Sequence, residues 1–240
     1  MFSPCAEFGI NNPALSMQLW DSLVRPTLMY AAEFWDVRDI SKGVLAGDQL
    51  HRDFLRRLLG VHSGTPNMAV LAEVGRYLMT VKAAKHLCNF WNRLVEMDDE
   101  RLVKQYFLQI AVLGPLTHSN LAHKSWAGQV VSFLATLGMP CNLITPLSVN
   151  VSTVVEKLQS SYLESVNACS GVKMQQNLHL RSEVDSASYT PAAYLQAVGG
   201  WRQRTHLAQL RTGSHRLVVE LGRNGRECKS RVGSKTASAL

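Results

Sequence analysis

The sequence predicts an all-α fold, and residues 50–95 carry the clearest evidence for it. Apolar side chains recur there every three or four positions, which places them on one face of a helix. Breaks separate the periodic stretches. Gly60 has the position of a left-handed C-cap, and Thr65-Pro66 has the form of an N-cap followed by proline at the first helical position. Thr80 is placed to cap the third helix, so three helices with basic outer faces are expected.

The composition is that of a globular protein with a packed core. Of the 240 residues, 46% are hydrophobic and 18% are charged, and no apolar run is long enough to predict a membrane-spanning helix. The N-terminus lacks a basic region followed by an apolar run, so no secretory signal is expected. The five cysteines are odd in number and widely spaced, which favours a reducing compartment, without separating nucleus from cytoplasm, over a disulfide framework or a zinc site.

The first part of the chain predicts an irregular lead-in over residues 1–13 and a helix over residues 14–36. Proline has no N–H group and a fixed φ, so Pro26 is expected to kink or divide this helix at about Arg25. Residues 37–43 predict a polar connection. The apolar residues of the helix are expected to be buried: Leu15, Leu19, Leu23, Leu28, Tyr30, Phe34 and Trp35.

The second part of the chain predicts further helices with longer connections between them. Their expected ranges are 101–113, ended by Gly114-Pro115; 121–137, ended by Gly138-Met139-Pro140; 151–168; 191–198; and 201–210. Residues 170–190 are rich in Ser and Gln, and residues 214–221 fit either a helix or a strand. The expected organisation is a helical bundle over 14–114, a looser helical connector over 115–222 and a disordered basic tail over 223–240.

The net charge of +7 is concentrated at the C-terminal end. Residues 1–200 carry 16 Lys/Arg and 16 Asp/Glu, whereas residues 201–240 carry nine Lys/Arg and two Glu. A basic tail of this kind favours polyanions such as nucleic acid or anionic membrane surfaces. The alternative interpretation, given equal weight, is a solvated end whose charge only aids solubility.

No catalytic motif is present in the sequence: a phosphate-binding loop, a dinucleotide-binding glycine motif, a zinc-protease motif and a nucleophile elbow are all missing. The eight histidines are scattered and predict no metal site. Asp98-Asp99 is similar to the paired aspartates of polymerases, but Glu96 stands where those have an aromatic residue, and the flanks are helical. The pair is interpreted as the acidic end of a helix. An enzyme, a metal and a cofactor are therefore not expected.

The basic residues of the helical faces form two groups. Arg52 follows Asp48 by four residues and Arg57 follows Asp53 by four, a spacing that gives ion pairs of roughly 0.2–0.5 kcal/mol each. The remaining basic residues have no such local partner and predict a surface that faces phosphates: Arg56, Arg76, Lys82, Lys85 and Arg93.

Six segments occur in an order that carries a family resemblance: LVRPTLMYAAEFW (23–35), LHRDFLRRLLGV (50–61), TPNMAV (65–70), EVGRY (73–77), the helix over 81–94, and LRTGSHRLVVELGR (210–223). Together they resemble the thumb and the post-thumb connector of reverse transcriptases from LINE-type (non-LTR) retrotransposons. The resemblance covers roughly residues 10–228. It departs from the family pattern at Tyr77-Leu78, where proline is usual.

The resemblance implies a polymerase thumb-like helical bundle, which in the family grips the template–primer duplex. The fingers, the palm with its paired aspartates and the endonuclease domain are absent from the sequence, and the expected Cys/His knuckle stops after Cys228. The expected function is therefore that of a non-catalytic fragment, with sequence-independent binding of RNA or an RNA–DNA duplex. The alternative is a self-associating or protein-interaction remnant with no selected function, because a thumb without its palm exposes an apolar face. The nucleic-acid-binding residues are expected to be Arg52, Arg56, Arg57, Arg76, Lys82, Lys85, Arg202, Arg204, Arg211, Arg216 and Arg223.

Overall fold

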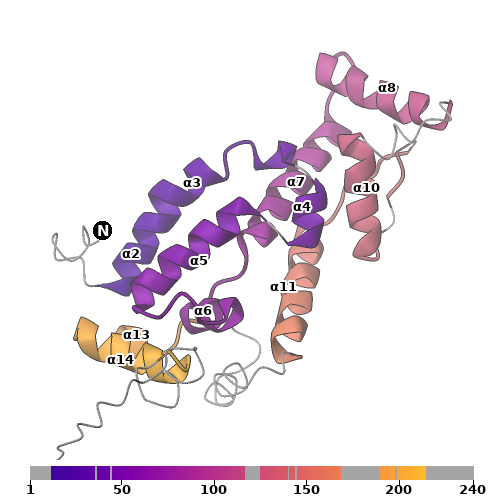
Figure 1. Cartoon of the computed structure of the whole chain (residues 1–240). Coiled ribbons are helices and arrows are strands. Elements are labelled where there is room, and N and C mark those ends of the chain that lie inside the picture. Colours follow the sequence, from indigo (N-terminus) through magenta and orange to yellow (C-terminus); the bar gives the residue numbers. More distant parts are fainter. Residues whose placement is uncertain are drawn as a thin grey trace, which may run out of the picture.

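The computed structural model describes residues 12–35, 37–43, 45–116, 125–139, 141–143, 145–168, 190–197 and 199–214, without the side chains of residues 110–116. Every regular element in this part of the chain is a helix, which confirms the all-α prediction (Figure 1). Most of the expected lead-in, most of the Ser- and Gln-rich segment and the expected basic tail lie outside the described residues.

The first helix is divided at proline, as expected. It consists of α2 (Pro13–Leu19), a π-helical turn η1 (Trp20–Val24) and α3 (Arg25–Leu28). The N–H of Arg25 donates to the carbonyl of Trp20, five residues back, so the wider turn immediately precedes Pro26. A π turn is a common way to accommodate a disturbed hydrogen-bond ladder, and here it keeps the two halves of the helix nearly continuous.

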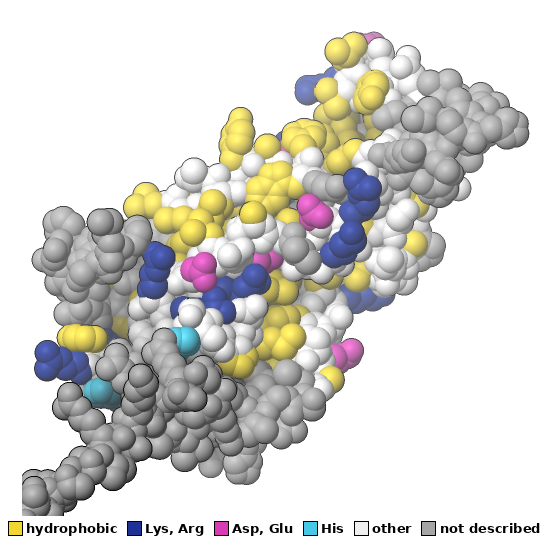
Figure 2. Space-filling model, viewed as in Figure 1, with side chains coloured by type: hydrophobic (Ala, Val, Ile, Leu, Met, Phe, Trp, Pro, Cys, Tyr) yellow, Lys and Arg dark blue, Asp and Glu magenta, His cyan; other side chains and the backbone are white. Residues whose placement is uncertain are grey.

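The burial expected along this helix is wrong at several positions. Pro13, Ser16 and Trp20 are buried at i, i+3 and i+7, and this face turns the leucines outward. Figure 2 shows hydrophobic side chains over α2 and α3. The exposed fractions are 42% for Leu15, 37% for Leu19, 64% for Leu23, 83% for Tyr30 and 62% for Phe34.

The polar connection expected at residues 37–43 is also wrong. Residues Val37–Lys42 form helix α4, preceded by the 3-10 turn η2 (Ala32–Phe34). Val37 and Ile40 are buried because their i, i+3 spacing aligns them toward the core.

Three helices form the centre of the molecule: α5 (Ala46–Leu59), α6 (Asn67–Val74) and α7 (Met79–Glu96). Gly60 ends α5 in the left-handed conformation with φ +66°, as expected. Pro66 occupies the N-cap position of α6 instead of the first helical position, so the helix begins one residue later than predicted. The hydroxyl of Thr65 makes no hydrogen bond among the described residues, so it does not cap this helix.

The N-terminus of α7 is capped from another helix. The carboxylate of Asp48, on α5, accepts hydrogen bonds from the N–H of Met79 at 2.5 Å and from the hydroxyl of Thr80 at 2.6 Å. The prediction that Thr80 caps α7 is therefore wrong, because its hydroxyl lies within the first turn and donates to Asp48. A buried carboxylate at this position satisfies a free N–H and favours the positive end of the helix dipole.

The described residues of the second part of the chain form α8 (Leu102–Leu116), α10 (Trp126–Thr136), α11 (Val151–Asn167), α13 (Tyr194–Ala197) and α14 (Trp201–Arg211). The expected stop at Gly114-Pro115 is wrong, because α8 continues to Leu116. This helix projects from one end of the molecule (Figure 1). Gly138 follows α10 with φ +66°, which confirms the expected break there. None of the described helices has both the length and the apolar character needed to span a bilayer.

Two hydrophobic clusters form the core. One is centred on α7, where Leu87 and Trp91 pack with Phe133 of α10 and Val154 of α11. The other joins α5 and α6 to the last helices, with buried members Leu55, Leu59, Val70, Tyr162, Val166, Leu195 and Ala208. Helices from both sides of residue 114 therefore contribute to both clusters, and α11 links them.

Gly75 provides a test of the packing between the end of α6 and the segment that precedes α13. Its φ is +65°, and a Cβ at this position would overlap the backbone of Thr190 and Pro191. We expect Gly75→Ala to lower the free energy of unfolding by roughly 3 kcal/mol or more. Gly43→Ala, with φ +68° and open space around the added carbon, should cost only about 1–2 kcal/mol.

Urea denaturation followed by circular dichroism measures both losses, with Gly199→Ala as a third variant. Gly199 has no positive φ, and no atom of the described residues lies near the added carbon, so that change should leave stability nearly unaltered. Equal losses in Gly75→Ala and Gly43→Ala would contradict the close approach at residue 190.

Candidate functional site

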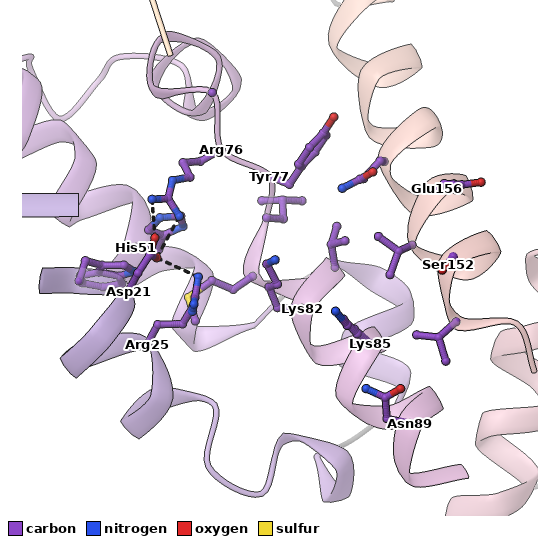
Figure 3. Close-up of a pocket in the computed structure, with 18 residues that line it drawn as sticks. Asp21, Arg25, His51, Arg76, Tyr77, Lys82, Lys85, Asn89, Ser152 and Glu156 are labelled. Carbon is purple, nitrogen blue, oxygen red and sulfur yellow. Dashed lines mark hydrogen bonds and ion pairs between the residues drawn. The ribbon is translucent and has the colours of Figure 1, made fainter. Parts of the chain in front are cut away.

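A cavity of about 680 Å³ lies between η1, α3, α7 and α11, and basic side chains line it (Figure 3). We call it the basic cleft and define it by Arg25, Arg76, Lys82 and Lys85. Three of these four were predicted from the sequence. The structure brings them together because Lys82 and Lys85 share one face of α7, while Arg76 comes from the connection that precedes this helix.

The two arginines of the basic cleft are held by Asp21. Arg76 donates from Nη1 at 2.9 Å and from Nη2 at 2.6 Å, and Arg25 donates from Nη1 at 2.9 Å. The sequence predicted no local i, i+4 partner for Arg76, and the partner that the structure shows is a distant one. Its partner lies 55 residues away in the sequence. One carboxylate therefore orients two guanidinium groups and leaves the pair with a surplus positive charge.

Lys82 and Lys85 are exposed, and neither forms a salt bridge within the described part of the chain. Burial lowers the pKa of Lys82, and the neighbouring charges of Arg25 and Lys85 lower it further. Partial burial is the larger cause of this shift, and the like charges around the amine add to it in a way that a bound anion would relieve. Glu156 of α11 is the other carboxylate among the residues that line the cavity, so cations outnumber carboxylates there.

His51 forms part of the cavity lining from α5 and is only 5% exposed. Its ring stacks on Trp20 at 5.3 Å between centroids, and Trp20 stacks on Phe54 at 4.5 Å. Burial, followed by the charge of Arg76, lowers the pKa of His51 to about 4. The imidazole is therefore neutral at pH 7, and its Nδ1 has no hydrogen-bond partner among the described residues.

Other predicted binding residues connect segments of the fold. Arg56 donates to Asp53 at 2.9 Å, to the carbonyl of Thr65 at 3.3 Å and to the side chain of Asn67. The expectation that Arg56 lacks a local partner is wrong, because Arg56 forms a salt bridge with Asp53 at a spacing of i, i+3. Asp48, expected to pair with Arg52, instead caps α7 with both of its oxygens.

Arg211 has a similar structural environment. Its Nε lies 3.0 and 3.1 Å from the two carboxylate oxygens of Glu73, whose side chain is fully buried. Its guanidinium also lies over the ring of Tyr194, 5.7 Å from the centroid. Removing one partner of a buried ion pair leaves an uncompensated charge, so Arg211 holds α14 to α6.

The remaining predicted residues are not part of the basic cleft. Arg57 is exposed on α5, and Arg204 is partly buried on α14. Arg202 is exposed, with its guanidinium 5.7 Å from the ring centroid of Trp201. Arg216 and Arg223 lie outside the described residues.

Three residues of the site were missed at the sequence level: Asp21, Arg25 and His51. Asp21 and Arg25 are four residues apart on a helical segment, which is a spacing typical of an ion pair. This spacing could have predicted the pair of Asp21 and Arg25, but it carries no information about the contact of Asp21 with Arg76. His51 has no local signal, because only the tertiary fold places it against the cavity.

Asp98 and Asp99 are exposed between α7 and α8, where the sequence predicted an acidic pair at a helix end. In the part of the chain that the structure describes, no group of three or more His, Cys, Asp or Glu side chains is arranged to hold a metal ion.

Comparisons with protein-family models, with curated proteins and with solved structures found no match to this chain. The likeness to a retrotransposon thumb therefore rests on the sequence segments that carry it.

The lowered pKa of His51 predicts a pH-dependent stability. The unfolded chain binds a proton at His51 near pH 6.5, whereas the folded chain binds it only near pH 4. Unfolding between these values takes up a proton, so the free energy of unfolding should fall as the pH drops from 6.5 to 4, by at most about 1.4 kcal/mol per pH unit.

His51→Phe keeps a ring against Trp20 but cannot titrate. Its stability should therefore fall less steeply with pH than that of the natural chain, as measured by urea denaturation at about pH 7, 5.5 and 4.5. Parallel curves for the two proteins would show that His51 is not held neutral by the fold.

Proposed function

We propose that the chain is a non-catalytic fragment of reverse transcriptase thumb type that binds nucleic acid through the basic cleft, without sequence specificity. The single observation that carries the proposal is the convergence of four cationic side chains from three segments on one cavity. Two of them, Lys82 and Lys85, have no salt-bridge partner among the described residues. The six-segment resemblance supports the same reading from the sequence.

The physical basis of the proposal is phosphate recognition. Exposed ammonium groups attract phosphates of any sequence and release condensed counterions, so affinity falls as salt rises. For three phosphate contacts, a change from about 50 to about 200 mM salt would weaken binding roughly 40-fold. Asp21 holds Arg25 and Arg76 in place before a ligand arrives, which reduces the ordering cost of binding.

The test compares two double variants with the same net charge. Lys82→Gln/Lys85→Gln removes the two unpaired cations of the cleft, and Lys42→Gln/Arg101→Gln removes two exposed cations that do not line it. Fluorescence anisotropy with an RNA–DNA duplex should show a loss of about tenfold or more in the cleft variant at low salt, together with a shallower salt dependence. The control variant should bind nearly as the natural chain does.

Equal losses in the two variants would remove the basic cleft from the proposal and leave only a general charge effect. Binding that is absent at low salt, or indifferent to salt, would reject nucleic-acid binding through phosphates altogether.

A specific observation favours the alternative of self-association. Leu15, Leu19 and Leu23 lie at i, i+4 and i+8 and are exposed along α2 and η1. Contiguous apolar surface on a soluble domain marks an interaction site or an aggregation liability. A second copy of the chain that covers this stripe would gain burial of apolar area.

Leu19→Glu/Leu23→Glu tests the alternative. If the stripe joins two copies, the charged variant should be monomeric at concentrations where the natural chain dimerises, because a buried carboxylate without a partner opposes association. Leu102→Glu, at an exposed leucine on α8, is the matched control and should dimerise normally. Sedimentation velocity measures all three, and a natural chain that is monomeric throughout would reject the alternative.

A further inference from the structure

The basic cleft is divided into a charged part and an apolar part. Arg25, Arg76, Lys82 and Lys85 supply the cations, whereas Leu78, Val81, Val151 and Val155 supply apolar lining. Figure 3 shows Tyr77 beside the cations, facing α11, which carries Ser152 and Glu156 on the opposite wall. A ligand that fits this division has an anionic group at one end and a flat, largely apolar body at the other.

The dimensions exclude a double helix from the interior. A volume of about 680 Å³ lies within the range of pockets that enclose one small ligand, whereas a duplex can only lay its phosphates across the opening. A single unpaired nucleotide has the right size and the right division, with a phosphate, a sugar and a base that has an exposed π face.

The polar groups within the lining suit a base of any identity. Asn89, Ser152 and Gln159 each carry groups that donate and accept hydrogen bonds. The buried Nδ1 of His51 has no partner among the described residues and would gain one from a ligand hydroxyl. An unsatisfied buried polar atom is costly, so a ligand that satisfies it is favoured.

We infer that the basic cleft holds one unpaired nucleotide of a single strand, with its phosphate toward Lys82 and Lys85 and its base against Tyr77, Val151 and Val155. This inference rests on the proposed function and makes it more specific, because it names single-stranded nucleic acid rather than duplex as the preferred ligand. The duplex then binds only by laying its phosphates across the opening of the cleft.

The experiment measures anisotropy of the full chain with three probes of one sequence: a single strand of about 12 nucleotides, a blunt duplex, and the duplex with a single-stranded overhang. The single strand and the overhang probe should bind at least about fivefold more tightly than the blunt duplex. Adenosine monophosphate should displace the single strand at lower concentration than inorganic phosphate does, because only the former supplies a base.

Ser152→Trp fills the cleft without removing a cation. Ser152 is exposed on α11 and lines the cavity, so the variant should lose the preference for the single strand and keep its affinity for the blunt duplex within about twofold. Ser161→Trp, on the exposed face of the same helix and outside the cleft, should keep the preference. The comparison of probes on the natural chain needs no variant and stands even if Ser152→Trp does not fold.

Two results would overturn the inference and spare the proposed function. One is equal, salt-dependent binding of all three probes that still requires Lys82 and Lys85. The other is a folded Ser152→Trp variant that keeps the single-strand preference. Absence of binding to any probe at low salt would instead reject the proposed function itself.

Discussion

The centre of the molecule depends on the hydrogen bonds by which the Asp48 carboxylate caps the N-terminus of α7. Burial raises its pKa, and the hydrogen bonds from Thr80 and Met79 act in the opposite direction by favouring the charged form. At the far end of α7, the ammonium of Lys104 donates to the carbonyls of Leu94 and Val95 at 2.9 and 2.8 Å. Charged side chains from neighbouring helices therefore occupy both ends of α7, each with the sign that the helix dipole favours. This helix carries the main core residues on one face and the lysines of the cleft on another.

Local chemistry explains which parts of the fold were predictable. The breaks at Gly60 and Gly138, the division at Pro26 and the amphipathic helix α11 each depend on a few neighbouring residues, and all were predicted. The helix at Val37–Lys42 was missed because its six residues bury only two apolar side chains, too few for a periodic signal. The cap of α7 was misassigned because its acceptor lies 32 residues from Thr80. Periodicity showed which residues share a face of a helix but not which face is turned toward the core. The leucines of α2 were therefore expected to be buried, although they are exposed.

The candidate site shows the same limit. Lys82 and Lys85 were predictable because they lie opposite the buried stripe of α7, and helical spacing alone separates the two faces. The roles of Arg76 and Arg211 depend on acidic partners 55 and 138 residues away, which no local pattern contains. These two arginines were grouped with exposed cations, although each is engaged by a carboxylate. The cavity itself arises from the packing of α11 against α7, which is also a long-range property.

The short connection between α6 and α7 has two neighbours at once. Gly75 lies against the backbone of Thr190 and Pro191, while Arg76 and Tyr77 line the basic cleft. A change in this connection therefore alters both the lining of the cleft and the surface against which the segment before α13 packs. The segment that leads into α13 therefore packs against the residue next to Arg76, which lines the cleft. A residue without a side chain at position 75 thus lets the backbone before α13 lie directly behind a site that the C-terminal helices do not line.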